Sequence, residues 1–237
     1  MHRFKCRLFG SILKRVHANR FNFHGLSVEV HPDMAPDIAY LVYRQRYELP
    51  EAKLISKHLG SGDHVVELGA SSGIMSALIG RNIGPTGRHI AVEANSILVD
   101  LIRRNAGDDV EILTAAVSYS DEDTVNFSVT SDTLGNRIVD ENETAITVPT
   151  IGLGDLIERY DLIEPVLVCD IEGAERDILE HDKAGLRRCR AVIMEIHPEL
   201  DGETLFDEQD FLKKFTRIGF EVKERMSRVV YMERSGQ

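Results

Sequence analysis

Short apolar runs alternate along the chain with segments in which apolar side chains recur every three or four residues. The apolar runs predict buried strands over residues 65–68, 89–92, 110–113, 166–169 and 191–194. The helical spacing between them predicts helices over residues 74–80, 97–105, 155–160 and 174–181. Strands that alternate with helices form a parallel sheet covered on both faces. The pattern therefore predicts an α/β fold of the doubly wound, Rossmann-like type.

The two ends of the chain depart from this alternation. Before the first core strand, the pattern predicts helices over residues 3–17, 37–46 and 50–59 and a strand over residues 26–30. After the last core strand, a helix over residues 208–217 precedes a pair of strand-like segments, which predict an antiparallel hairpin over residues 220–224 and 229–233. We therefore expect an N-terminal extension and lead-in module over residues 1–49, followed by one α/β domain over residues 50–237.

The alternation also breaks between residues 119 and 149, where the chain is polar and acidic. This stretch predicts either a pair of exposed strands or a mobile loop over a site, because loops on a rigid scaffold often determine which substrate binds. A solvated insertion that touches no ligand is an equally good interpretation.

The charge of the chain adds information about its partners. The 237 residues carry a formal net charge of −11, which disfavours nucleic acid because phosphate neutralisation supplies most of the affinity for it. The N-terminal segment is nevertheless basic, and no acidic residue precedes Glu29. A helix over residues 3–17 would carry apolar side chains on one face. It could pack on its own domain or contact an anionic membrane surface or a partner.

Cysteine usage and hydropathy suggest where the protein resides. The three cysteines, Cys6, Cys169 and Cys189, form no C-x-x-C pair, which favours a reducing compartment and indicates no zinc site. No apolar run is long enough to span a bilayer. A cytoplasmic protein is the resulting expectation.

A glycine turn after the first core strand is the clearest functional signal. The run HVVELGASSG begins at His64, and its glycines would let the backbone approach a ligand. The turn segment supplies five candidate cofactor-binding residues: Glu67, Gly69, Ala70, Ser71 and Gly73. Glu93 closes the next strand, where a carboxylate can accept hydrogen bonds from both ribose hydroxyls of an adenosine.

The spacing within this turn distinguishes between nucleoside cofactors. A dinucleotide fingerprint requires G-x-G-x-x-G, but Ser71 and Ile74 stand where its second and third glycines would be. A carboxylate at Glu67 suits a cationic ligand better than a pyrophosphate. The turn therefore favours S-adenosylmethionine over a nicotinamide or flavin dinucleotide. A turn that only packs helix on strand is the remaining alternative.

A second group of ionisable residues follows two later strands. Asp170 and Glu172 come directly after the strand at 166–169, and Glu195 and His197 come at the end of the strand at 191–194. The carboxyl ends of parallel strands are where ligands bind in such sheets, so we expect these four side chains to converge. Methyl transfer to oxygen needs a positioned acceptor and a group that takes its proton. Asp170 is the first candidate for that base or for anchoring the acceptor, and His197 is the second.

Two other roles remain open for this group. Asp170, Glu172 and Glu195 could bind a magnesium-like cation that lowers the pKa of the acceptor hydroxyl. Alternatively, some of the acids could cap the helix that follows, because acids favour helix N-termini. Glu175 is the residue that we expect to be a cap or a surface acid.

At these residues the chain resembles the FkbM-type methyltransferases. The similarity covers about residues 40 to 200 and rests on HVVELGASSG, AVEAN with Ala94 and Asn95, VCDIEGAERDIL, AVIMEIH and the pair Tyr47-Glu48. The resemblance implies a class I methyltransferase fold, which usually ends in an antiparallel pair. It also implies that the glycine turn, Glu93, Ala94, Asn95, Tyr47 and Glu48 bind the cofactor, with Asp170 and Glu172 on the acceptor side.

The resemblance and the residues together give one functional expectation. We expect S-adenosylmethionine-dependent O-methylation of a hydroxyl on a sugar, a polysaccharide precursor or a secondary metabolite. The acceptor would be a small molecule or a carbohydrate and not a nucleic acid. The alternatives are a dinucleotide-dependent oxidoreductase and a catalytically inactive module that binds S-adenosylmethionine or a partner.

Overall fold

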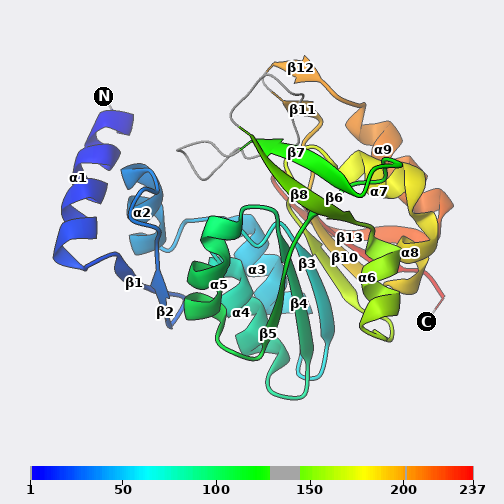
Figure 1. Cartoon of the computed structure of the whole chain (residues 1–237), viewed down its shortest axis with the longest axis horizontal. Helices are drawn as coiled ribbons and strands as arrows, with labels where there is room; N and C mark the ends of the chain where they lie inside the picture. Colours follow the sequence, from blue (N-terminus) through cyan, green and yellow to red (C-terminus); the bar gives the residue numbers. More distant parts are fainter. Residues whose placement is uncertain (1, 129–144, 201, 237) are drawn as a thin grey trace.

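The computed structural model describes residues 2–128, 145–200 and 202–236, and its centre is a seven-stranded sheet (Figure 1). The strands lie in the order β13-β14-β10-β9-β3-β4-β5. Their bounds are β3 His64–Leu68, β4 Arg88–Glu93, β5 Val110–Thr114, β9 Val166–Cys169, β10 Ala191–Glu195, β13 Phe220–Met226 and β14 Val229–Arg234. The other six strands run in one direction, and β14 runs opposite to them, antiparallel to both β10 and β13. The predicted parallel sheet with a C-terminal antiparallel hairpin is therefore confirmed.

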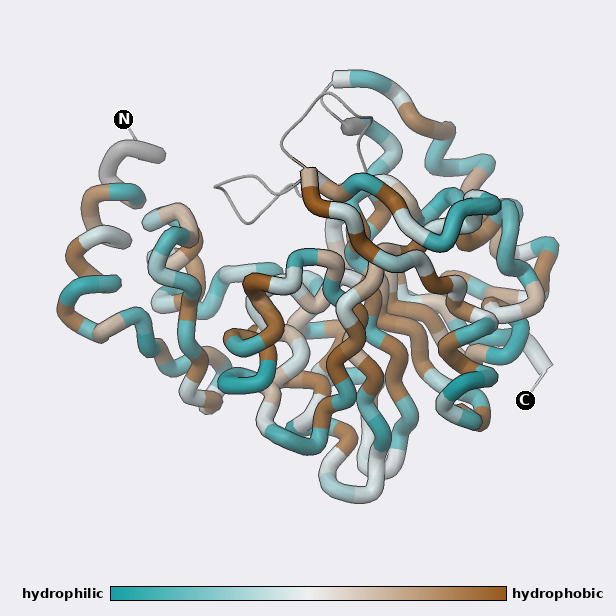
Figure 2. The backbone as a smooth tube through the Cα atoms, in the orientation of Figure 1, coloured by the Kyte–Doolittle hydropathy of each residue, from teal (hydrophilic) through white to brown (hydrophobic). Residues whose placement is uncertain are grey.

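Helices cover both faces of this sheet, as alternate strand residues require. Val65 and Val168 face a core that includes α3 and α4, while the next residue of each strand points to the opposite core. One face is covered by α3 Leu49–His58, α4 Ile74–Ile83 and α5 Val99–Ala106, and the other by α6 Leu153–Arg159, α7 Glu175–His181, α8 Lys183–Arg188 and α9 Glu208–Arg217. Figure 2 shows the central strands as a hydrophobic band between more polar helix surfaces.

The N-terminal residues form a small module on the α3 and α4 side of the sheet. It consists of α1 His2–Val16, β1 Arg20–Phe23, β2 Leu26–Glu29 and α2 Pro36–Tyr43. Phe21 and Phe23, in a strand that the sequence pattern did not predict, enter the same hydrophobic core as α3 and α4. The sheet domain and this module therefore share apolar packing, and the boundary at residue 49 stays a prediction.

Helix α1 packs closely against α2. Gly10 is buried there, and a Cβ on it would lie 1.6 Å from the backbone oxygen of Pro36. The interpretation that this helix packs on its own domain is confirmed for the face that carries Gly10 and Leu13. Leu8, Phe9, Ile12 and Val16 of α1 are exposed, and their contact with a membrane or a partner stays a prediction.

The insertion between β5 and α6 forms a second, smaller sheet. Strand β8 Ala145–Ile151 pairs antiparallel with β7 Thr124–Ser128 and parallel with β6 Ala116–Val117. The expected pair of strands is thus present, while residues 129–144 lie outside the described residues. Short elements elsewhere are η1 Ser96–Leu98, β11 Glu199–Leu200 and β12 Glu203–Thr204. Within the described ranges, none of the helices has the length and apolar character needed to cross a bilayer.

Candidate active site

A cavity of about 520 Å³ opens at the carboxyl ends of the central strands. Its walls come from the segments that follow β3, β4, β9 and β10, from the two residues before α3, and from β6 and β7 of the small sheet. Because β9 and β10 are parallel neighbours with Cys169 opposite Met194, Asp170 and Glu195 leave the sheet at the same level. The topology thus brings together the two groups of residues that the sequence singled out.

The turn after β3 forms one end of this cavity and is shaped by glycine. Gly69 has a φ of +87°, and a Cβ on it would lie 1.8 Å from the backbone oxygen of Asp170. Gly73 has a φ of +74°, and a Cβ there would lie 2.6 Å from the Cα of Ile102. Both positions combine a left-handed backbone with close packing, which only glycine tolerates. The turn is therefore packed between the end of β9 at Gly69 and α5 at Gly73, while Ser71 lines the cavity.

Glu93 lies at the tip of β4 and is held in place by the backbone. Its two carboxylate oxygens accept hydrogen bonds from the N–H groups of Ser71 and Asn95, each at 2.7 Å. Burial raises the pKa of Glu93, and these two N–H donors oppose the rise. A carboxylate can accept about four hydrogen bonds, so Glu93 keeps acceptor capacity for a ligand in the cavity.

Four of the residues predicted to bind cofactor do not line the cavity: Glu67, Ala70, Gly73 and Asn95. Glu67 accepts a hydrogen bond from the hydroxyl of Ser76 at 2.7 Å and contacts His89 Nε2 at 2.9 Å inside the core. Asn95 accepts a hydrogen bond from the N–H of Ile97. Glu67 and Asn95 therefore lie behind the turn in this structure, and their predicted contact with the cofactor stays a prediction. Gly69, Ser71, Glu93, Ala94, Tyr47 and Glu48 do line the cavity.

The opposite end of the cavity holds the second group of ionisable side chains. His197 Nε2 lies 3.6 Å from Glu172 Oε2, 3.8 Å from Asp170 Oδ1 and 3.8 Å from Glu195 Oε1. We name these four residues, Asp170, Glu172, Glu195 and His197, the acceptor cluster. The expected convergence is therefore observed. Among the described residues, the cavity lining contains no Lys or Arg to balance these acids.

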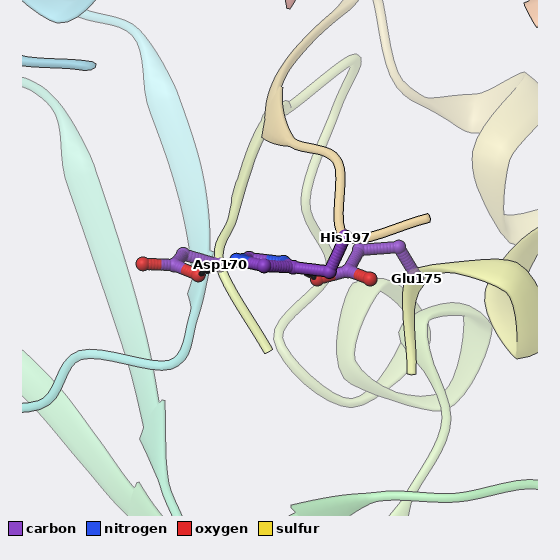
Figure 3. Close-up of side chains that lie close together, drawn as sticks. All are labelled: Asp170, Glu175 and His197. Atoms are coloured by element: carbon purple, nitrogen blue, oxygen red, sulfur yellow. Dashed lines mark hydrogen bonds and ion pairs between the residues drawn. The ribbon is translucent and has the colours of Figure 1, made fainter. Parts of the chain in front are cut away.

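Glu175 holds His197 from behind, which the sequence did not reveal. Figure 3 shows the imidazole of His197 between the carboxylates of Asp170 and Glu175. His197 Nδ1 lies 2.9 Å from Glu175 Oε1, and the N–H groups of Ile171 and Gly173 also donate to this carboxylate. The interpretation of Glu175 as a surface acid is wrong, because its side chain is fully buried. It stabilises the turn before α7 and orients His197.

The acidic surroundings shift the pKa values of the groups at this end of the cavity. Burial raises the pKa of Asp170 well above its usual range, and Glu51 and Glu195 add to the rise. Burial, with Glu195 and Glu172, raises the pKa of Glu48 to about 7. Burial alone would lower the pKa of His197, but Glu175 and the neighbouring acids outweigh it and raise that pKa to about 9. The cluster therefore favours positively charged groups.

Backbone strain also concentrates around the cavity. Glu48, Ser71 and Glu172 line it with φ values of +39°, +49° and +53°, in the left-handed region that most residues avoid. Such conformations cost about 1–3 kcal/mol each and are typical of ligand-binding sites. All three residues lie in segments that a strand or helix pattern cannot predict.

The small sheet completes the cavity as an apolar wall. Val125 and Phe127 of β7 line it together with Val117 and Leu205. The interpretation that the insertion lies over the site is therefore correct for β7. The individual residues of this wall were not predicted. The stretch is acidic overall, and its short alternation of apolar and polar residues was not recognised as a strand.

A comparison with known families identifies the chain. The model of the methyltransferase FkbM domain matches residues 26–222, which is most of the sequence. The chain belongs to the FkbM methyltransferase family. The resemblance expected from HVVELGASSG and VCDIEGAERDIL is therefore confirmed, and the alternative of a dinucleotide-dependent oxidoreductase is excluded.

Several solved structures are similar to this chain at low sequence identity. A protein from Clostridium thermocellum, proposed to be an rRNA methylase, has a TM-score of 0.51 at 10% identity, covering 78% of this chain and 94% of that chain. A methyltransferase from Pyrococcus furiosus has a TM-score of 0.48 at 13% identity, covering 100% and 99%. Aeropyrum pernix fibrillarin with natively bound S-adenosyl-L-methionine has a TM-score of 0.45 at 15% identity, covering 78% and 73%. The first of these supports the class I methyltransferase fold.

The cofactor of this FkbM methyltransferase is S-adenosylmethionine, and the residues at the turn end of the cavity fit it. Gly69 lines the cavity with backbone alone, and Glu93 offers acceptors suited to the ribose hydroxyls. The buried hydroxyl of Ser71 has no hydrogen-bond partner among the described residues, so it is available to a ligand. We name Gly69, Ser71, Glu93 and Ala94 the donor half of the cavity.

Proposed function

We propose that this FkbM methyltransferase methylates a hydroxyl group of a sugar, a polysaccharide precursor or a secondary metabolite. The observation that carries the proposal is the position of the acceptor cluster in the same cavity as the donor half. When bound, S-adenosylmethionine supplies a methyl carbon attached to a positively charged sulfur. The donor half would hold this cofactor, with the Glu93 carboxylate placed to accept hydrogen bonds from the ribose hydroxyls and the backbone of Gly69 close to the ligand.

The acceptor cluster supplies the groups that an attacking hydroxyl needs. Asp170 and Glu172 present carboxylate oxygens that can accept a hydrogen bond from the hydroxyl, and His197 lies within 3.8 Å of both. Holding the oxygen in line with the methyl group removes most of the entropic barrier. We assign the removal of the hydroxyl proton to this cluster, with Asp170 as the first candidate. His197 is the second, and because its pKa is raised to about 9 it can take the proton only in its neutral form, at alkaline pH.

The character of the cavity supports an uncharged or cationic acceptor. Six carboxylates line it, on Glu48, Glu93, Asp170, Glu172, Asp177 and Glu195, and no Lys or Arg lies among the described lining residues. A phosphate or carboxylate on the acceptor would be repelled at these short distances. The apolar wall at Val125 and Phe127 offers a surface for the face of a sugar ring or for a hydrocarbon segment.

Transfer of a labelled methyl group into fractions of a cell extract tests this proposal. We expect label in a low-molecular-weight or carbohydrate fraction, as a methyl ether that survives alkali, with its position fixed by mass spectrometry. Asp170→Asn should abolish the labelling, and the exposed substitution Glu158→Gln on α6 should leave it unchanged. Label in protein or nucleic acid would overturn the proposal. Binding of S-adenosylmethionine without transfer to any fraction would favour an inactive binding module.

A further inference from the structure

Helix α1 is held on the molecule by one of its faces. Gly10 is buried against the backbone of Pro36, and Leu13 packs on the core that α2 shares with the sheet domain. The Nζ atom of Lys14 donates a hydrogen bond to the backbone oxygen of Met34 at 2.8 Å. Figure 1 shows α1 at the outer edge of the molecule, with α2 between it and the sheet. The orientation of the helix is therefore fixed, and its opposite face is presented to the surroundings.

That opposite face is apolar. Its four large side chains are exposed, with exposed fractions of 54% for Leu8, 55% for Phe9, 50% for Ile12 and 72% for Val16. Their spacing places them on one side of the helix, and we name them the apolar face of α1. They are half of the eight large hydrophobic side chains that are exposed among the described residues. Single exposed apolar side chains are normal, but a contiguous group marks an interaction surface.

The charge of this segment indicates what covers the apolar face. Residues 1–28 contain six Lys or Arg and no Asp or Glu, so the remaining residues carry a formal charge of −17. Arg7 and Arg15 are exposed, form no ion pair within the described ranges, and lie in one row beside the apolar face. Such side chains can lay their stems on an apolar phase while their charged heads reach anionic groups. An anionic surface therefore attracts α1 and repels the rest of the protein, which fixes the orientation of binding.

We propose that α1 binds the surface of a membrane that contains anionic lipids, with the helix axis along the surface. The apolar face enters the boundary between headgroups and acyl chains, and Arg7 and Arg15 contact the lipid phosphates. A second copy of the chain fits this face less well, because two basic helices would then face each other. None of these residues lines the cavity, so the inference does not depend on the proposed function.

The fluorescence of an introduced tryptophan tests the inference, because the chain contains no tryptophan of its own. We expect the emission of Phe9→Trp to shift to shorter wavelength when the full chain meets vesicles of phosphatidylcholine and phosphatidylglycerol, since the indole leaves water. Vesicles of phosphatidylcholine alone should cause a much smaller shift. Ile163→Trp is the matched control, because Ile163 is 74% exposed in the segment between α6 and β9. Its emission should not change with either kind of vesicle.

Sedimentation with the mixed vesicles measures the contribution of the apolar face. Phe9→Gln combined with Ile12→Gln should weaken binding by about 10-fold or more, because the two side chains no longer bury apolar area in the membrane. Ile163→Gln should leave binding unchanged. Calorimetric binding of S-adenosylhomocysteine verifies that each variant is folded.

The same assay measures the contribution of the basic row. Arg7→Gln combined with Arg15→Gln should weaken binding by about 10-fold or more at low salt, and by much less at high salt, where charges are screened. Lys213→Gln combined with Arg217→Gln removes the same charge from exposed positions of α9. This control should change binding by less than about twofold, because screening confines the attraction to charges near the membrane.

Other outcomes would contradict the inference or separate it from the proposed function. Absence of sedimentation with the mixed vesicles at low salt, or equal affinity for the two kinds of vesicle, would overturn membrane binding. Self-association that Phe9→Gln with Ile12→Gln abolishes, without vesicle binding, would show that a second copy covers the face and would also overturn it. Methyl transfer to a hydroxyl by a chain that binds no vesicle would leave O-methylation standing. Vesicle binding by a chain that methylates no hydroxyl would overturn O-methylation alone.

Discussion

The two ends of the cavity are built in different ways. In the donor half, backbone N–H groups of Ser71 and Asn95 hold Glu93, and Gly69 packs its backbone directly against the end of β9. In the acceptor cluster, side chains face one another, and the buried Oδ1 of Asp170 has no donor within the described residues. Each half thus holds one buried polar atom without a hydrogen-bond partner among the described residues, Ser71 Oγ or Asp170 Oδ1, but only the donor half is held in shape by backbone hydrogen bonds.

This difference shows that the shape of the donor half depends on local backbone geometry. A cofactor common to a whole family can be held by a turn whose shape depends on glycine and on one strand-end carboxylate. An acceptor that differs among family members requires side chains that converge from several elements. Substitutions in the two halves should therefore separate cofactor binding from methyl transfer.

The largest effect is expected from Asp170→Asn. The amide keeps the shape of the side chain but cannot take up a proton, and a positioned proton acceptor contributes about 10²- to 10⁴-fold to rate. We expect turnover to fall by about that factor, while the affinity for S-adenosylhomocysteine, measured by calorimetry, stays within about threefold. A loss of cofactor affinity equal to the loss of turnover would show that the two halves are not separate.

Gly69→Ala tests the backbone construction of the donor half. Its Cβ would lie 1.8 Å from the backbone oxygen of Asp170, so the turn or the end of β9 must move. We expect the free energy of unfolding in urea to fall by about 3 kcal/mol or more. Gly107→Ala is the matched control, because Gly107 has a φ of +90° but a Cβ added to it would meet no atom within 4 Å. Backbone strain alone should cost it about 1 kcal/mol, and equal losses in the two variants would contradict the close packing.

Glu93→Gln tests whether the negative charge of Glu93, and not only the shape of its side chain, is needed to bind the ribose of the cofactor. Hydrogen bonds to a charged acceptor contribute about 1.5–3 kcal/mol, so the affinity for S-adenosylhomocysteine should fall by about 10- to 100-fold. Turnover at saturating cofactor should change much less, because Glu93 does not face the acceptor. A larger effect on turnover than on cofactor affinity would show that Glu93 acts in methyl transfer and not in cofactor binding.

Glu175→Gln should have the smallest effect of the four. Glu175 is a positioning residue, because it touches His197 and the backbone but does not line the cavity. We expect turnover to fall by about 10-fold with cofactor affinity unchanged. Glu180→Gln, an exposed change on the same helix, should leave turnover intact. An unchanged rate in Glu175→Gln would show that the orientation of His197 is not required.

The same comparison explains how much could be predicted from the sequence. The strand, glycine turn and helix around Gly69 are local, so their spacing predicted both the elements and the place of Glu93. The burial of Glu175 was missed because it depends on His197, which is 22 residues away in the next strand segment. Sequence spacing cannot show to which side of a turn a side chain points, so the position of Glu67 and Asn95 behind the turn was not predicted, and their role in cofactor binding stays a prediction. Phe127 was missed because its wall forms only when β7 pairs with β8.

The most direct test of the account is diffraction from crystals grown with S-adenosylhomocysteine. We predict that the ribose hydroxyls donate to Glu93 and that the backbone at Gly69 contacts the ligand. The sulfur should face the acceptor cluster at Asp170 and His197. A ligand whose ribose lies away from Glu93, or whose sulfur points away from that cluster, would contradict the division of the cavity into a donor half and an acceptor half.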